Sequence, residues 1–176
     1  MPNYFVFDQI NHPLFTKQVN TFIAPGIESV PEGGAAKAGI LFAANFSSTV
    51  AAGQNLILQT SNPVTSGKTM YISRVSGSSS TAGTTVTLLK NGTVSGAAVT
   101  PVNLNFGSAN TSAMAVKSAT GTVAGSPVTF LTLLLPAGEF VIDFTGRIVV
   151  PEDNSLTVTV GTGATTATAN VIWWEY

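Results

Sequence analysis

The sequence predicts an all-β fold: an antiparallel jelly-roll-like β-sandwich preceded by an extended N-terminal arm. From residue 35 onward, short runs rich in Val, Ile, Leu, Thr and Phe are separated by clusters of Gly, Ser, Asn and Pro, without a sustained helical period. The chain also holds 24 Thr and 16 Ser while only 9% of its residues are charged, which is typical of sheet surfaces solvated by hydroxyl groups. At 176 residues the chain fits one domain, residues 35–176, plus the arm.

Residues 1–34 are predicted to form a connector arm and linker, because prolines and glycines recur throughout and interrupt any long regular element. Within this segment "NHPLFTKQVNTFI" places Phe15, Val19, Phe22 and Ile23 at helical spacing. A short helix and an extended conformation are both compatible with that pattern.

The sandwich domain is predicted to hold nine strands. Their approximate ranges are 40–46, 55–61, 69–76, 84–90, 128–135, 139–143, 147–150, 155–160 and 166–174.

Individual motifs refine these strands. In "SLTVTV" Leu156, Val158 and Val160 alternate with hydroxyl residues, as in a half-buried antiparallel strand. The pair Asn91-Gly92 is a hairpin turn signal. The run "VTFLTLLL" is predicted to be a buried strand, since it is too short to span a membrane as a helix.

The connections favour a particular sandwich topology. Gly146 in "FTGR" predicts that 139–143 folds back on 147–150, with Asp143 facing Arg147. A long loop is expected over 94–127. Long loops between eight or nine strands favour a jelly roll over an up-and-down barrel.

Composition argues against several function classes. The formal net charge of -1 leaves no basic surface for nucleic acid or for a membrane. The chain has no cysteine, so we expect neither disulfides nor a thiolate nucleophile. The first residues do not resemble an export signal, because Asp8 precedes the first Lys and no apolar run with a cleavage site follows. We therefore expect a protein made in the cytoplasm and released by lysis, located on a spore surface or otherwise extracellular, or in a virion.

Motifs that carry chemistry are incomplete, so we expect no enzyme, cofactor or metal site. "NPVTSGKT" ends like a phosphate-binding loop but has Asn62 where the motif needs glycine, and a strand-like run follows it. The single histidine, His12, lies in the arm, away from any serine or acid that the sequence places beside it. Glu139 and Asp143 on one strand would lie about 13 Å apart, too far for a glycosidase pair. "VPEDNSL" is predicted to be a polar turn instead of a calcium site.

The arm contains the most distinctive segment, "YFVFDQI". In an extended strand Tyr4 and Val6 project to one side while Phe5 and Phe7 project to the other, and Ile10 follows. Apolar residues on both faces suit a strand that is covered on both sides. The arm is predicted to insert into a neighbouring subunit, and the alternative is that it completes the sheet of its own domain.

The C-terminal "NVIWWEY" places Trp173, Trp174 and Tyr176 together as interface or ligand aromatics. Adjacent strand residues point to opposite faces, which predicts one Trp in the core and the other at a subunit contact. A sugar-stacking platform is the alternative.

The connector segment and the closing pattern "GRIVVPEDNSLTVTVGTGATTATANVIWWEY" resemble the subunits of bacillus-type endospore appendages. The resemblance implies a jelly roll whose N-terminal connector inserts into the next subunit of a homo-oligomeric fibre, with spore-surface anchor and tip proteins as partners. Unlike the disulfide-linked appendage types, this chain would have to assemble by noncovalent strand addition.

A second resemblance concerns "TVTLLKNGTVSGAAVTPVNLNFGSAN", which is similar to stretches of phage structural proteins. It implies a virion decoration or tail-fibre protein as the alternative function. A carbohydrate-binding module ranks third.

Overall fold

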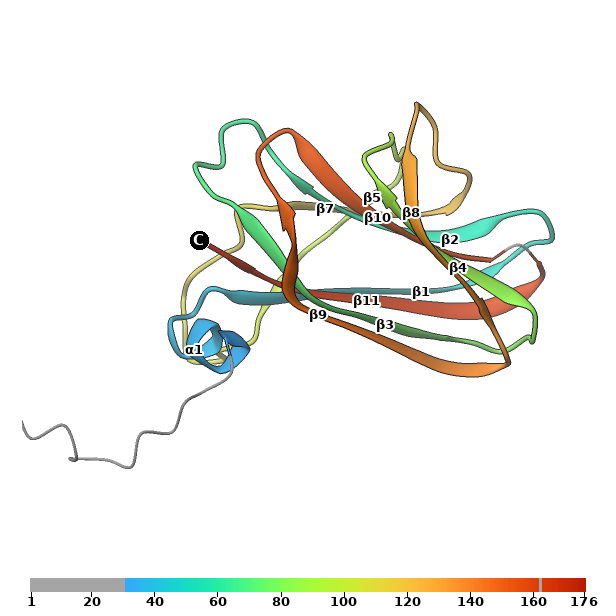
Figure 1. Cartoon of the computed structure of the whole chain (residues 1–176), viewed down its shortest axis with the longest axis horizontal. Coiled ribbons are helices and arrows are strands. Elements are labelled where there is room, and N and C mark those ends of the chain that lie inside the picture. The colour runs from blue at the N-terminus through green and yellow to red at the C-terminus, as the bar shows by residue number, and fades with distance from the viewer. Residues whose placement is uncertain (1–30, 162) are drawn as a thin grey trace, which may run out of the picture.

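The computed structural model of this chain describes residues 31–161 and 163–176. In this part of the chain two antiparallel sheets pack face to face, and one short helix lies at one end of the strands (Figure 1). The predicted all-β sandwich is therefore confirmed. The elements are α1 (Pro31–Lys37), β1 (Leu41–Val50), β2 (Asn55–Asn62), β3 (Met70–Ser79), β4 (Thr84–Lys90), β5 (Ala97–Val99), β6 (Val102–Asn103), β7 (Ala115–Gly121), β8 (Val128–Leu135), β9 (Gly138–Val150), β10 (Asn154–Gly161) and β11 (Thr165–Glu175).

The strand order is that of a jelly roll. One sheet has the order β6-β1-β11-β3-β9 and the other β5-β7-β2-β10-β4-β8. The antiparallel pairs are nested, β1 with β11, β2 with β10, β3 with β9 and β4 with β8. This nesting is what results when one long hairpin is rolled into two sheets, so the predicted jelly-roll-like topology is also confirmed.

The core lies between the two sheets and consists of the inward-facing residues of each strand. Leu58, Leu88 and Val158 from one sheet meet Ile72 and Trp173 from the other, and all five are fully buried. The Trp173 ring lies against Phe42 with centroids 6.3 Å apart. The alternation of apolar and polar residues that predicted these strands therefore also determines which side chains enter the core.

The prediction of a long loop over 94–127 is wrong. This segment, inserted between β4 and β8, contains β5, β6 and β7, and β7 pairs along the whole of 55–61 in β2. The turn that leads into the insert contacts the outer face of this sheet, where Gln59 donates to the carbonyl of Gly92 and Thr157 donates to the carbonyl of Asn91. Thr157 and Thr159 are consequently buried, so β10 is covered on both faces and not half-buried as expected.

The two predicted hairpins are also corrected. Residues 139–143 and 147–150 belong to one strand, β9, in which residues 144–147 bulge opposite the single residue Ser73 of β3. Asp143 consequently pairs with Arg74 of β3 and not with Arg147. Asn91 and Gly92 do have positive φ angles of 62° and 97°, as a tight turn requires, but the chain then continues into the insert.

The helix α1 is not predicted by the sequence, since "PEGGAAK" contains two glycines of low helix propensity. It has Pro31 at its first position, Glu32 in its first turn and Lys37 in its last, all favourable there. Ser73 of β3 donates a hydrogen bond to the Glu32 carboxylate at 3.1 Å. Tertiary contacts therefore hold the helix against the sheet. None of the helices in the described ranges is long and apolar enough to cross a membrane.

Candidate assembly site

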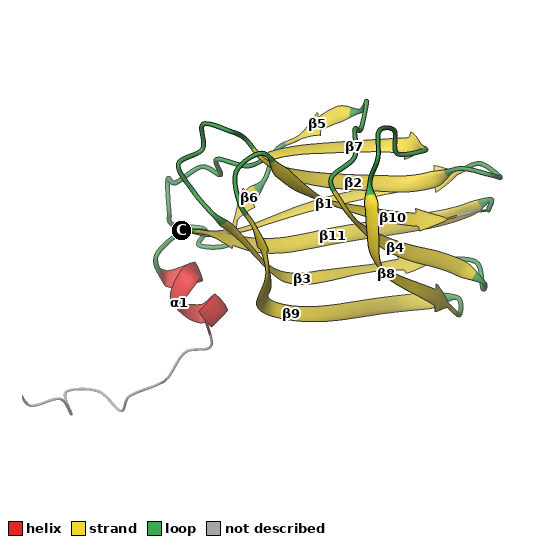
Figure 2. Ribbon diagram, turned by 45° about the horizontal axis from the view of Figure 1, so that its top comes forward, coloured by secondary structure: helices red, strands yellow, loops and turns green. Residues whose placement is uncertain are grey.

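The two sides of the sandwich are closed to different extents. On one side the insert adds β7 and β5 beyond β2, and β6 beyond β1. On the other side β9 ends one sheet and β8 ends the other, and in the described structure each pairs with a single neighbour, β3 and β4 respectively. Figure 2 shows β8 and β9 on the side away from β5 and β7. Main-chain donors and acceptors along both outer edges are therefore open to another strand.

The core is incompletely covered along this open side. Five hydrophobic residues that pack on the core from β8 and β9 remain partly exposed: Leu131, Leu133, Ile142, Phe144 and Ile148. On the closed side, Met114 and Val116 of the insert are both buried. Three further residues of this kind, Phe46, Val99 and Ala113, lie on the closed side, so most but not all of the half-buried apolar side chains around the core belong to the open side.

The outward-facing residues of the same strands are also apolar. Among the described residues, nine large hydrophobic side chains are exposed, and five of them lie on β8 or β9: Val128, Phe130, Leu134, Val141 and Val149. Scattered exposed hydrophobics are ordinary, but Val128, Phe130 and Val149 line one groove beside the sheet edges, which is typical of an interaction surface.

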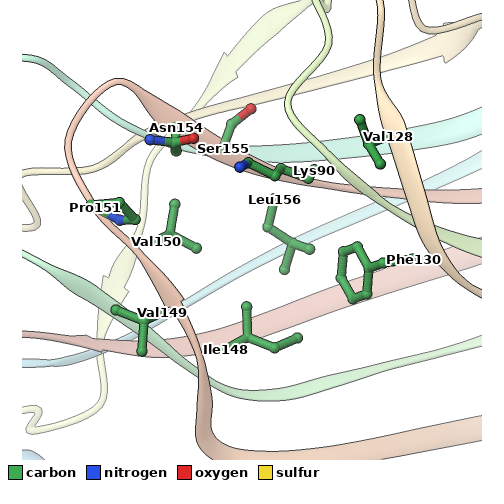
Figure 3. Close-up of a pocket in the computed structure, with 10 residues that line it drawn as sticks. All are labelled: Lys90, Val128, Phe130, Ile148, Val149, Val150, Pro151, Asn154, Ser155 and Leu156. Carbon is green, nitrogen blue, oxygen red and sulfur yellow. The ribbon is translucent and has the colours of Figure 1, made fainter.

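A groove of about 360 Å³ lies at one end of this side, between the start of β8 and the end of β9 (Figure 3). We call it the β8/β9 groove. Its walls are mainly apolar, with Val128 and Phe130 from β8 facing Ile148 and Val150 from β9, and Leu156 of β10 between them. Polar groups also line it, namely Lys90, Asn154 and Ser155. A pocket of this size and composition suits a few apolar side chains flanked by polar contacts.

Phe130 reaches the groove because β8 carries a bulge. Leu131 pairs with Leu88 and Thr129 with Leu89, so Phe130 is the extra residue on β8. A bulge in an edge strand changes the direction of one side chain and bends the strand. Here it places an aromatic ring at 46% exposure in the groove wall.

The sequence prediction for β8 is wrong in one respect. "VTFLTLLL" is an edge strand with most residues exposed or half-exposed, and not the buried strand that its apolar character suggested. The sequence of β8 has apolar residues on both faces, and this pattern could have indicated an interaction surface. The same pattern is also typical of a central, buried strand, so the sequence did not distinguish the two.

The predicted inter-subunit residues Tyr4, Phe5, Val6, Phe7 and Ile10, together with His12, lie outside the described residues. The structure therefore does not place them relative to the groove.

Trp173 and Trp174 lie on opposite faces of β11, as predicted. Trp173 is fully buried, Trp174 lies on the outer face of its sheet, and Tyr176 is exposed. Trp174 stacks on Tyr71 with centroids 5.6 Å apart and also packs against the backbone of Gly146. These contacts occupy the Trp174 ring, so the three aromatics do not form one flat surface.

Sequence reasoning missed Glu175, which is 1% exposed. Its carboxylate accepts hydrogen bonds from Ser112, from the Ala113 amide at 2.9 Å and from Trp173 Nε1 at 3.0 Å, and Lys68 Nζ lies 4.0 Å away. Two of these donors belong to the insert. Glu175 therefore anchors the insert to the last strand, a structural role.

The remaining motifs are turns. "NPVTSGKT" forms the connection between β2 and β3, in which the Gly67 amide donates to Glu152 from "VPEDNSL". Across 31–161 and 163–176, no three His, Cys, Asp or Glu side chains are grouped to hold a metal ion. No protein-family model, curated protein or solved structure matches this chain.

Proposed function

We propose that this protein is a structural subunit of a self-assembling extracellular fibre, and that it polymerises when the N-terminal arm inserts noncovalently into a neighbouring subunit. The observation that carries this proposal is the open side of the sandwich. There, unpaired edges of β8 and β9 flank half-buried core residues, whereas the insert covers the opposite side.

The arm has the chemistry that such a surface needs. A segment with apolar residues on both faces is stabilised where it is covered on both sides, and main-chain hydrogen bonds to a sheet edge add to that stabilisation. Burial of Tyr4, Phe5, Phe7 and Ile10 at about 1.5–3 kcal/mol each contributes roughly 6–12 kcal/mol. Ordering about eight backbone residues costs a similar amount, at about 1–2 kcal/mol each.

These magnitudes favour assembly over simple pairing. One arm alone would bind weakly, because burial and ordering nearly cancel. Edge hydrogen bonds and several arms that act together in an oligomer supply the remaining stabilisation. Contacts between two different surfaces of the same subunit propagate into a filament unless they close into a ring.

The expected location follows from the same properties. A surface rich in hydroxyls, with few charges and no cysteine, suits a fibre on a spore surface or another extracellular site, attached through anchor and tip proteins. A virion decoration or tail-fibre protein is the alternative, and it would also use an exchanged arm.

Deletion of residues 1–10 tests the proposal. We expect the variant to fold, because both sheets and the core between them are built from strands within residues 41–175, and to form no fibres in electron micrographs. Phe106→Ser is the matched control, since this residue is 90% exposed on the insert and should leave fibres intact. Fibres of normal length from the deletion variant would refute the proposal, whereas rings that bind only capsids or tails would favour the virion alternative.

A further inference from the structure

We infer that the β8/β9 groove is the acceptor for residues 4–8 of a second copy of this chain, with Val6 in the groove and Asp8 paired with Lys90. The inference rests on the proposed function and adds the docking position. It joins three features: the apolar walls of the groove, the open strand edges beside it, and a basic group at its rim.

The groove provides both kinds of contact that an added strand needs. Val128 and Phe130 on one wall and Ile148 and Val150 on the other supply surface for an apolar side chain. The outer edges of β8 and β9 supply main-chain hydrogen-bonding groups. Strand addition of this type derives affinity from the main chain and specificity from pockets for alternate side chains.

Charge complementarity selects the register. Lys90 ends β4 at the groove, its side chain is exposed, and none of the ion pairs in the described structure includes it. The segment "MPNYFVFDQI" carries one charged side chain, Asp8. Because Val6 and Asp8 project to the same side of an extended strand and lie about 7 Å apart along it, Val6 in the groove directs Asp8 to the rim beside Lys90.

The length of the spacer allows the arm to reach a second copy. Residues 11–30 separate the apolar segment from α1, and 20 residues span at most roughly 66–72 Å when extended. The longest strand, β9, has 13 residues and extends over about 43 Å at most. The arm can therefore reach beyond its own sandwich, and the prolines in the spacer oppose its collapse.

The test uses charge reversal in the full chain. Lys90→Glu and Asp8→Lys should each raise the critical concentration for fibre formation about tenfold or more, because each places like charges together at the rim. The combined variant Asp8→Lys/Lys90→Glu should assemble nearly as the native chain does. Lys117→Glu is the matched control, since Lys117 is an exposed residue of β7 on the closed side and its reversal should change little.

Mixing the two single variants separates exchange between copies from docking within one chain. In a mixture, the native groove of the Asp8→Lys variant can accept the native arm of the Lys90→Glu variant, and the charge-reversed groove can accept the charge-reversed arm. We expect the mixture to form alternating fibres although neither variant does so alone at that concentration. Circular dichroism of each variant verifies that both are folded.

The remaining outcomes of these experiments would each contradict a different part of the proposal. Rescue in the combined variant without rescue in the mixture would place the arm in the groove of its own chain. Native assembly by both single variants, or failure of both rescues, would overturn the inferred position. If the 1–10 deletion still abolishes fibres in that case, the proposed function stands and the arm docks elsewhere; if fibres survive the deletion, the proposed function fails as well.

Discussion

Replacement of Glu175 by alanine is expected to destabilise the domain strongly, because three hydrogen-bond donors lose their acceptor at once. The donors are Ser112 Oγ, the Ala113 amide and Trp173 Nε1. They differ in their access to water. Trp173 is fully buried, whereas Ser112 and Ala113 are half-buried and can find water partners.

The magnitude follows from this difference. A buried donor without a partner costs about 1–3 kcal/mol, and the lost charge-assisted bonds to the insert bring the total to about 2–5 kcal/mol. Glu175→Gln keeps one acceptor oxygen but turns an amide donor toward the other donors, so its loss of stability should be intermediate. Glu152→Ala is the control, because Glu152 is exposed, and it should cost less than about 1 kcal/mol.

Urea unfolding monitored by tryptophan fluorescence measures these differences in the free energy of unfolding. A loss below about 1 kcal/mol for Glu175→Ala would refute the reasoning, since it would mean that the buried Trp173 Nε1 donor is satisfied in another way.

Two further substitutions test the packing of the sandwich. Gly146→Ala should destabilise the domain by more than Gly53→Ala. Both glycines have positive φ angles, 82° and 79°, but a Cβ at 146 would clash with the Trp174 ring whereas nothing lies within 4 Å of a Cβ at 53. Near-ultraviolet circular dichroism should also show loss of the Tyr71–Trp174 stack in Gly146→Ala, and equal unfolding free energies of the two variants would contradict the prediction. Leu88→Ala should lower the free energy of unfolding by about 2–5 kcal/mol, because Leu88 is fully buried. Leu134→Ala should lower it little, because Leu134 is 75% exposed on β8. Similar losses for the two variants, measured by chemical denaturation, would mean that β8 is buried.

The fold class could be predicted because its signals are local. Alternation in "SLTVTV" places Leu156, Val158 and Val160 in the core regardless of their partners. The boundaries of the long strands follow from the Gly, Ser and Asn clusters between them. The jelly-roll topology was supported only by the strand count and the loops, and the nested pairs confirm it.

The missed elements depend on distant partners. "AVKSATG" has little β propensity of its own and becomes β7 because it pairs with the edge of β2. The hairpin expected at Gly146 was wrong because a glycine with positive φ serves a bulge as well as a turn. Local sequence does not distinguish these two uses.

The groove and the buried carboxylate were missed for a related reason. Periodicity shows which faces of a strand are apolar, but it does not show whether the strand is central or at an edge, so β8 was expected to be buried. Glu175 is buried because residues 112 and 113, more than 60 positions earlier, provide its donors. The apolar arm was visible in the sequence, whereas the surface we propose for it required the structure.

A cryo-electron microscopy reconstruction of the assembled protein tests the central claim most directly. We predict that residues 4–8 of one subunit lie in the β8/β9 groove of the next, hydrogen-bonded to an edge of β8 or β9, with Asp8 beside Lys90. An arm seated in its own sandwich, or subunits joined while the groove remains empty, would contradict the account.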